Sequence, residues 1–144
     1  MIYHGIDIIE IDRIRRAVRR WGERFLRRVY TAGEISDCDA LGPAPRYQSL
    51  AARWAAKEAV AKALGVGLSG VAAGAATATR PGMNDIEVLR AADGRPSLRL
   101  HGPAAAAATA LGIAELALSL SHSGGNAVAS VVALGNEIQY NTPP

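Results

Sequence analysis

The first thirty residues change from a strand pattern to a helical pattern of apolar positions. Residues 2–11 are rich in isoleucine around Asp7 and predict a short strand. From about Asp12, apolar residues recur at steps of three and four, which is typical of an amphipathic helix. The expected buried stripe of that helix comprises Ile11, Ile14, Val18, Trp21 and Phe25.

A longer helix is expected in the middle of the chain. Residues 31–46 hold two glycines and two prolines and predict a connection with a short helical turn at 32–40. The long helix follows over residues 49–64, with Ser49 as its N-cap and Gly65 as its C-terminal stop. Its alanines form a narrow face that another element can approach closely: Ala52, Ala55, Ala56, Ala59 and Ala63.

The second half of the pattern combines short strands with one helix. Residues 68–83 are rich in glycine, alanine and threonine and predict a loop. Asp93 and Gly94 separate two short apolar runs, which is a hairpin signal. The expected elements are strands at 86–90 and 97–101, a helix at 103–111, and strands at 116–121 and 127–134. Together they predict one α+β domain over residues 1–136 and a loose tail at 137–144.

The composition agrees with a single folded domain, and the basic residues are concentrated in one segment. The chain has 144 residues, 49% of them hydrophobic, and is long enough to bury a core. It holds no apolar run of the roughly 18 residues that a membrane span needs and no basic secretory leader, so we expect a cytoplasmic protein. The single Cys38 excludes an intramolecular disulfide. The formal charge is only +3, but eight of the sixteen basic residues lie between Arg13 and Arg28, which indicates an anionic partner.

Three charged residues interrupt the apolar middle helix: Lys57, Glu58 and Lys62. Glu58 and Lys62 have the spacing of an ordinary helical ion pair, worth a few tenths of a kcal/mol. Asp7 introduces a second interpretation, because a carboxylate inside an apolar strand is costly without a partner. The partner is either an arginine or a strand-end contact, or it is a Mg²⁺ shared with Glu58, since magnesium prefers oxygen ligands and keeps waters and phosphates. The sequence alone leaves both alternatives open.

Three further patterns each have an ordinary and a functional interpretation. Residues 65–70 match the G-x-G-x-x-G dinucleotide motif, but a helix is expected before them and a loop after them, so that interpretation fails. His122, between two expected strands, is either a turn histidine or a contact to a phosphate or a base. The arginines of the first helix form either a solvated face or a docking surface for nucleic acid or an acidic protein. Aromatic residues make up only 5% of the chain, which disfavours binding of single-stranded nucleic acid.

Five pieces of the sequence occur in the order found in one enzyme family: GIDIIEIDRI, RFLRRVYTAGE, RWAAKEAVAKALGVG, DIEV with DGRP, and LSLSHSGGNAVASVV. They resemble the holo-[acyl-carrier-protein] synthases, which are single-repeat 4′-phosphopantetheinyl transferases. The resemblance implies the α+β fold of that family, with a small antiparallel sheet, a homotrimeric assembly and active sites between subunits. It also implies transfer of 4′-phosphopantetheine from coenzyme A to a serine of apo acyl carrier protein, dependent on Mg²⁺, with release of adenosine 3′,5′-bisphosphate. The holo-carrier then serves fatty acid or polyketide synthesis.

The resemblance implies roles for individual residues. Asp7 and Glu58 match the Mg²⁺ ligands, Lys62 matches a lysine that contacts the phosphates, and Glu58 is also a candidate general base. The positions near coenzyme A are Arg53, Lys62, Gly65, Pro96 and His122. Arg13 matches a basic residue that faces the carrier protein. Because carrier proteins are acidic, the resemblance gives a docking role to the whole arginine stripe, which includes Arg13, Arg16, Arg20 and Arg24.

Two features depart from the family pattern, and two other functions stay open. The loop at 68–83 is longer and richer in glycine and alanine than expected, and the turn at 122–126 is small. One alternative is a module that binds carrier protein or coenzyme A without turnover, and Mg²⁺-dependent product formation separates it from an enzyme. The other is a nucleic-acid-binding domain, which predicts tight duplex binding with a steep salt dependence.

Overall fold

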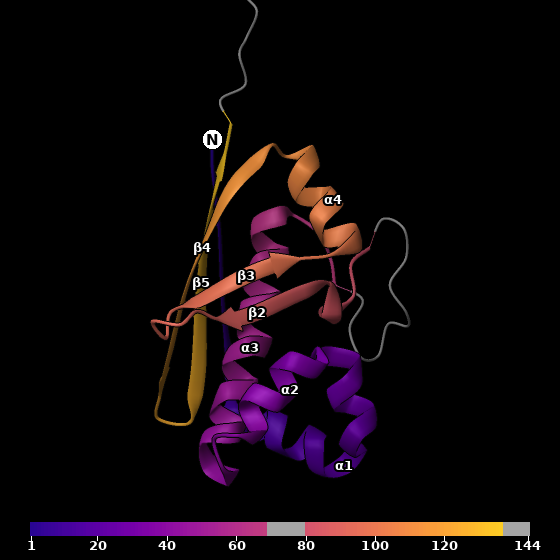
Figure 1. Cartoon of the computed structure of the whole chain (residues 1–144), viewed down its shortest axis with the longest axis vertical. Helices are drawn as coiled ribbons and strands as arrows, with labels where there is room; N and C mark the ends of the chain where they lie inside the picture. The colour runs from indigo at the N-terminus through magenta and orange to yellow at the C-terminus, as the bar shows by residue number, and fades with distance from the viewer. Residues whose placement is uncertain (69–79, 137–144) are drawn as a thin grey trace, which may run out of the picture.

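The computed structural model describes residues 1–68 and 80–136, and its element order agrees with an α+β domain (Figure 1). Within those ranges the elements are β1 (Ile2–Glu10), α1 (Ile11–Val29), α2 (Ala32–Asp39), α3 (Pro43–Leu64), the 3₁₀ turn η1 (Met83–Asp85), β2 (Ile86–Arg90), β3 (Pro96–Leu100), α4 (Gly102–Ala110), β4 (Ile113–Ser123) and β5 (Asn126–Gly135). Most of the loop predicted at 68–83 and the tail predicted at 137–144 lie outside the described residues.

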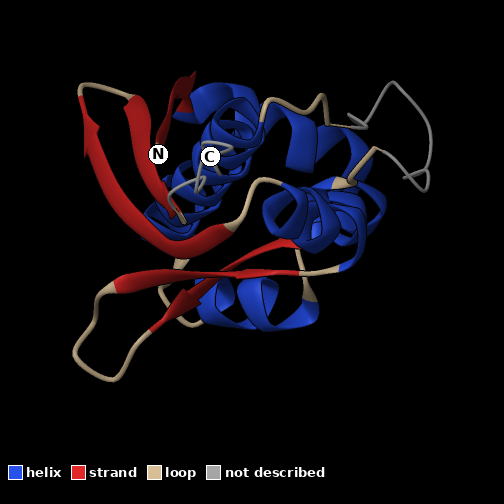
Figure 2. Ribbon diagram, turned by 90° about the horizontal axis from the view of Figure 1, so that it is seen from above, coloured by secondary structure: helices blue, strands red, loops and turns tan. Residues whose placement is uncertain are grey.

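Two antiparallel sheets flank α3. The larger sheet has the strand order β1-β5-β4, and the smaller sheet is the β2–β3 hairpin predicted around Asp93 and Gly94. Helix α3 runs along the inner face of the larger sheet, and the hairpin crosses near its other side (Figures 1 and 2). Helices α1 and α2 lie together at one end of the molecule and α4 at the other (Figure 1). The strands at β4 and β5 are longer than predicted, and β4 includes His122, which is a strand residue paired with Ala127 rather than a turn residue.

Small residues allow β1 and α3 to approach closely. The predicted alanine face of α3 is buried, with Ala55, Ala56 and Ala59 fully excluded from solvent. Gly5 faces it from β1, and a Cβ built on Gly5 would lie only 1.8 Å from the Ala59 carbonyl oxygen. Only glycine fits at such a contact, and the register places Asp7 two residues further along the same face of β1. The backbone contact therefore sets where Asp7 meets α3.

The first turns of α3 were not predicted correctly. The helix begins at Pro43, after Gly42, and not at Ser49. Proline is well tolerated in the first turn of a helix, where its missing N–H would have no intrahelical partner, so Pro43 and Pro45 start the helix instead of ending a loop. The predicted stop is correct: Gly65 closes α3 with φ +67°.

The predicted apolar stripe of α1 is wrong at one position. Ile11, Ile14 and Phe25 are buried, but half of the surface of Trp21 is exposed. The helix breaks directly after Trp21, at Gly22, whose φ of +55° and ψ of −137° are far from helical values. Trp21 and Phe25 therefore do not lie on one continuous helical face, and only Phe25 is buried.

Candidate active site

A carboxylate and a lysine from distant parts of the chain meet where β1 crosses α3. The Lys62 Nζ lies 2.9 Å from Asp7 Oδ1 and donates to the Ile6 carbonyl oxygen, also at 2.9 Å. The Asp7 side chain is only 17% exposed, whereas that of Lys62 is 55% exposed. The ion pair of Lys62 is therefore made with Asp7 rather than with Glu58, one helical turn before it.

Glu58 belongs to the same cluster. Partial burial, followed by the nearby negative charge of Asp7, raises the pKa of Glu58, while Lys62 and Arg13 act to lower that pKa. The charges of Asp7, Lys62 and Arg13 therefore all act on Glu58. We call Asp7, Glu58, Lys62 and Arg13 the carboxylate cluster.

The carboxylate cluster suits a hard divalent cation that keeps much of its hydration. Two half-buried carboxylates that repel each other gain stability from a cation between them. Within residues 1–68 and 80–136, no group of three or more His, Cys, Asp or Glu side chains is arranged to hold a metal. A cation here would thus have two protein ligands and fill its other positions with water or ligand oxygens, the pattern that Mg²⁺ shows beside phosphates.

A cavity of about 470 Å³ lies between the start of α3, the β2–β3 hairpin and β4. Its lining includes three residues predicted to lie near coenzyme A, namely Arg53, Pro96 and His122. A smaller cavity of about 230 Å³ shares Gln48 and His122 with it and continues past the backbone of residues 123–125. The other two predicted residues, Lys62 and Gly65, line neither cavity, because both lie at the far end of α3.

Arg53 supplies a poorly compensated positive charge to this cavity. It is 7% exposed, its Nη1 donates to the Ser49 hydroxyl, and its Nε has no hydrogen-bond partner. The nearest carboxylate oxygen, on the half-exposed Asp37, is 3.6 Å from Nη2. A buried guanidinium with so little compensation favours an anionic ligand in the cavity.

The carboxylate cluster and the Arg53 cavity lie on different faces of α3. Arg53 and Glu58 are five residues apart, which separates them by about 7.5 Å along the helix and by roughly 140° around it. Arg53 points toward the hairpin and β4, whereas Glu58 and Lys62 point toward β1. One chain therefore presents two half-sites that face in different directions.

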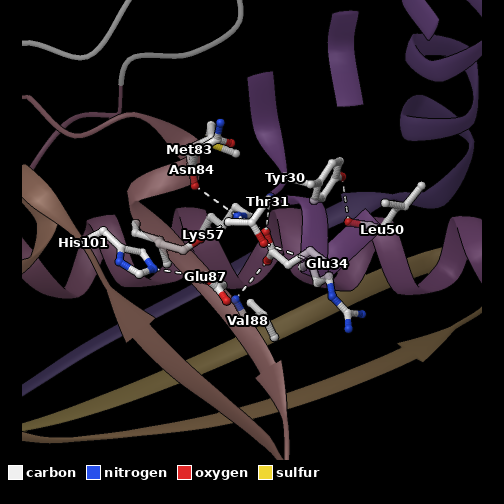
Figure 3. Close-up of polar contacts among 12 residues, drawn as sticks. Tyr30, Thr31, Glu34, Leu50, Lys57, Met83, Asn84, Glu87, Val88 and His101 are labelled. Atoms are coloured by element: carbon white, nitrogen blue, oxygen red, sulfur yellow. Dashed lines mark hydrogen bonds and ion pairs between the residues drawn. The ribbon is translucent and has the colours of Figure 1, made fainter. Parts of the chain in front are cut away.

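Lys57 has a structural role that the sequence did not reveal. It is fully buried, and its Nζ donates to Glu34 Oε2 at 2.8 Å, to Met83 O at 3.1 Å and to Ile86 O at 2.5 Å (Figure 3). Glu34 also accepts hydrogen bonds from the backbone N–H groups of Thr31 and Val88. Burial lowers the pKa of Lys57, but Glu34 opposes that shift, and all three ammonium protons have oxygen acceptors.

Lys57 therefore does not belong to the carboxylate cluster, although it is next to Glu58 in the sequence. Its side chain ties α3 to α2 and β2, on the opposite side from the carboxylate cluster. The partner Glu34 is 23 residues earlier in the chain, and no local spacing indicates the pair. The capping box of Thr31 and Glu34 was visible in the sequence and would have predicted that α2 is a full helix.

The arginine stripe of α1 is a solvent-facing surface. Arg13, Arg16, Arg20 and Arg24 are all exposed. Arg16 is partly neutralised by Asp12, with 2.7 Å between Nη1 and Oδ2. The stripe begins at Arg13, which belongs to the carboxylate cluster, and continues along α1 away from it.

Known proteins resemble this chain in sequence over nearly its whole length. The family described as the 4′-phosphopantetheinyl transferase superfamily matches residues 4–131. The chain is 58% identical over 133 residues to the holo-[acyl-carrier-protein] synthase of Chloroflexus aggregans, covering 92% of this chain and 95% of that protein. It is 52% identical over 135 residues to that of Herpetosiphon aurantiacus, covering 94% and 100%.

Solved structures agree with this assignment. The holo-[acyl-carrier-protein] synthase of Helicobacter pylori in complex with coenzyme A matches with a TM-score of 0.71 at 30% identity, covering 93% of this chain and 100% of that one. That of Bacillus anthracis, in complex with CoA (3′,5′-ADP), gives a TM-score of 0.70 at 31% identity, covering 93% and 96%. The chain therefore belongs to the 4′-phosphopantetheinyl transferase superfamily, as one of its holo-[acyl-carrier-protein] synthase enzymes. Over residues 1–68 and 80–136, none of the helices is long and apolar enough to cross a membrane.

Proposed function

We propose that this enzyme transfers 4′-phosphopantetheine from coenzyme A to a serine of apo acyl carrier protein in a Mg²⁺-dependent reaction. The names of its relatives and their complexes with coenzyme A support the two substrates. The observation that carries the proposal is the meeting of Asp7, Glu58 and Lys62, because the transfer needs charge neutralisation at a pyrophosphate.

The carboxylate cluster supplies the groups that the chemistry needs. Asp7 and Glu58 would hold the Mg²⁺, which when bound neutralises charge on the pyrophosphate oxygens. The serine oxygen attacks the β-phosphorus, and the bond from that phosphorus to the bridging oxygen breaks to release adenosine 3′,5′-bisphosphate. Lys62 is exposed enough to reach the phosphates and stabilise the leaving oxygen. Glu58 takes the serine proton, directly or through a water.

The second half-site suits the adenosine end of coenzyme A. Arg53 brings a buried guanidinium whose charge is poorly compensated, His122 adds two ring nitrogens, and Pro96 adds an apolar surface beside them. A 3′-phosphorylated nucleoside offers the anionic and flat groups that such a cavity accommodates. Gly65 stays with the other half-site, where its backbone lies one turn past Lys62.

The two half-sites also support a homotrimer with active sites between subunits. The outer face of the larger sheet exposes a continuous set of large apolar side chains: Ile2, Ile6, Ile8, Val132 and Leu134. Such a patch on a small protein marks an interaction site. Assembly through this face would bring the carboxylate cluster of one chain to the Arg53 cavity of the next.

The remaining parts of the proposal concern the acceptor. The exposed arginines of α1 match the acidic surface of a carrier protein, which favours rapid encounter and correct orientation. The carrier that receives the group would serve fatty acid or polyketide synthesis.

Intact mass spectrometry of the carrier tests the reaction. Purified enzyme is mixed with apo acyl carrier protein, coenzyme A and Mg²⁺, and a phosphopantetheine-sized gain on the carrier is expected. The gain should vanish with EDTA and with Glu58→Ala. If several carriers gain no mass, the protein is a binding module and the proposed function is wrong.

Mixed subunits test the assembly. Glu58→Ala and Arg53→Ala should each be inactive alone, because each removes one half-site. When the two variants are unfolded and refolded together, hybrid trimers would contain intact interfaces and recover part of the wild-type rate. If both half-sites act within one chain, no hybrid regains activity and the shared site is refuted.

A further inference from the structure

Trp21 is a large aromatic side chain that the helical pattern predicts to be buried, but in the structure it is exposed. Half of its surface is accessible, and the break at Gly22 keeps it apart from the buried Phe25 and Leu26. The backbone at Gly22 has φ +55° and ψ −137°, a conformation that glycine adopts far more readily than other residues. Trp21 is thus the last residue of the regular helical segment before the break.

The surroundings of Trp21 are basic. The guanidinium of Arg20 lies 4.8 Å from the centre of the Trp21 ring, a cation–π arrangement that holds both side chains at the surface. Arg19 and Arg24 are exposed nearby, and the neighbouring acid, Glu23, has an ion pair with Arg27 at 3.5 Å. Tryptophan and arginine are the residue types that most often dominate binding energy at protein interfaces.

Trp21 lies on the same helix as Arg13 of the carboxylate cluster. The two are eight residues apart on the regular part of α1, which rotates Trp21 by about 80° around the helix axis from Arg13. Trp21 therefore lies about 12 Å along the axis from Arg13. Because the charge of Arg13 acts on Glu58, a carrier protein that docks on α1 and presents its serine to the cluster would cover both Arg13 and Trp21.

The other large exposed apolar residues do not share this surface. Ile2, Ile6, Ile8, Val132 and Leu134 lie on the larger sheet, and Leu41 lines the Arg53 cavity. Trp21 stands instead among exposed arginines on α1. A partner that binds here would therefore present an apolar side chain within an acidic surface.

We propose that Trp21 is the apolar anchor of the carrier-protein docking surface, and that it inserts against an exposed apolar side chain of an acidic helical carrier. This inference rests on the proposed function for the identity of the carrier. The arginines attract the partner over long range and set the encounter rate, whereas Trp21 acts only at contact and sets how long the complex lasts. Salt then separates the two contributions, because it screens exposed charges but not apolar contact.

Steady-state kinetics test the anchor. Trp21→Ala should raise KM for apo carrier about tenfold and leave kcat and KM for coenzyme A unchanged, while Trp21→Phe retains most of the affinity. At about 0.5 M salt the effect of Arg20→Gln should shrink, and that of Trp21→Ala should persist. A KM for carrier within twofold of wild type in Trp21→Ala would overturn the proposal.

A direct binding measurement does not depend on turnover. The protein has two tryptophans, so 5-fluorotryptophan labelling gives two fluorine resonances, and Trp21→Phe assigns them. Addition of apo acyl carrier protein should shift or broaden the Trp21 resonance. A resonance that stays unmoved at a carrier concentration that saturates transfer overturns the anchor and leaves the transferase intact. Absence of mass gain on the carrier with a shifted resonance supports the anchor and refutes the transferase.

Discussion

Gly5→Ala tests whether the contact between β1 and α3 holds both the fold and the active site. The added Cβ would lie 1.8 Å from the Ala59 carbonyl oxygen and 2.9 Å from the Ala63 nitrogen, both of which are backbone atoms. To restore a separation of at least 3.0 Å from that oxygen, β1 and α3 must move apart by about 1.2 Å. No side-chain rotation can relieve the clash, so the cost should be near the upper end of overpacking, about 3 kcal/mol.

The same displacement should reach the chemistry. Asp7 is two residues from Gly5 on the same strand, and its carboxylate depends on α3 for the 2.9 Å contact with Lys62. A misplacement of about 1 Å in a catalytic constellation costs on the order of 100-fold in rate. We therefore expect Gly5→Ala to lose both stability and most of its kcat, even where the protein is still folded.

Urea denaturation followed by circular dichroism measures the first effect, and carrier modification at a temperature where the variant is folded measures the second. Gly33→Ala is the matched control, because the nearest atom to its added Cβ is 3.9 Å away and alanine favours the α2 helix. The control should be as stable as wild type or more stable. A free energy of unfolding of Gly5→Ala within 1 kcal/mol of wild type would refute the reasoning about this contact.

Three further predictions concern charged groups. Arg13 lowers the pKa of Glu58, so Arg13→Ala should move the acid limb of kcat to higher pH, measured at saturating carrier. Because the folded-state pKa of Glu58 is raised, the stability that Glu58 provides is complete below its unfolded pKa and is lost as pH rises through the folded pKa. Metal-free Glu58→Gln should accordingly have a higher Tm than wild type at neutral pH and the same Tm near pH 4. Lys57→Met or Glu34→Gln should each cost about 3–5 kcal/mol in urea denaturation, because each leaves a buried charge without its partner.

Each of these predictions has a control and a contrary result. Arg19→Ala is the control for Arg13→Ala. It removes a positive charge from the same helix, but Arg19 is not among the charges that act on Glu58, so the pH profile of the variant should match wild type. A Glu58→Gln protein that is less stable than wild type at neutral pH would show that the cations outweigh burial at this site. The double variant Lys57→Met with Glu34→Gln should lose less stability than the sum of the single losses, and strict additivity would mean that the two residues do not interact.

The sequence was most informative where local chemistry determines structure. The end of α3 follows from Gly65, which adopts the left-handed conformation that a helix stop favours, and the hairpin follows from the turn at Asp93 and Gly94. The close approach of β1 to α3 was anticipated only as an alanine face, because the sequence does not say which element covers it. Periodicity failed at Trp21, because the pattern assumes one continuous helix and the helix breaks directly after Trp21, at Gly22.

The active site was predictable by resemblance and not by spacing. The distance of 55 residues between Asp7 and Lys62 gives no reason from the sequence for their contact. The sheet register and the Gly5 contact bring them together, and both are long-range properties of the fold. Lys57 was unpredictable for the same reason, because its partner Glu34 comes from α2 and its carbonyl acceptors come from η1 and β2.

The position of β5 between β1 and β4 affects how the enzyme matures. Within the larger sheet β1 pairs only with β5, and His4 contacts Ser130 across 126 residues of chain. Contacts between residues so far apart in sequence form late and reduce the folding rate. During synthesis, Glu58 and Lys62 therefore leave the ribosome long before the strand that carries Asp7 gains its hydrogen-bonded neighbour. A chain interrupted before β5 would contain every residue of the carboxylate cluster and still lack the cluster itself.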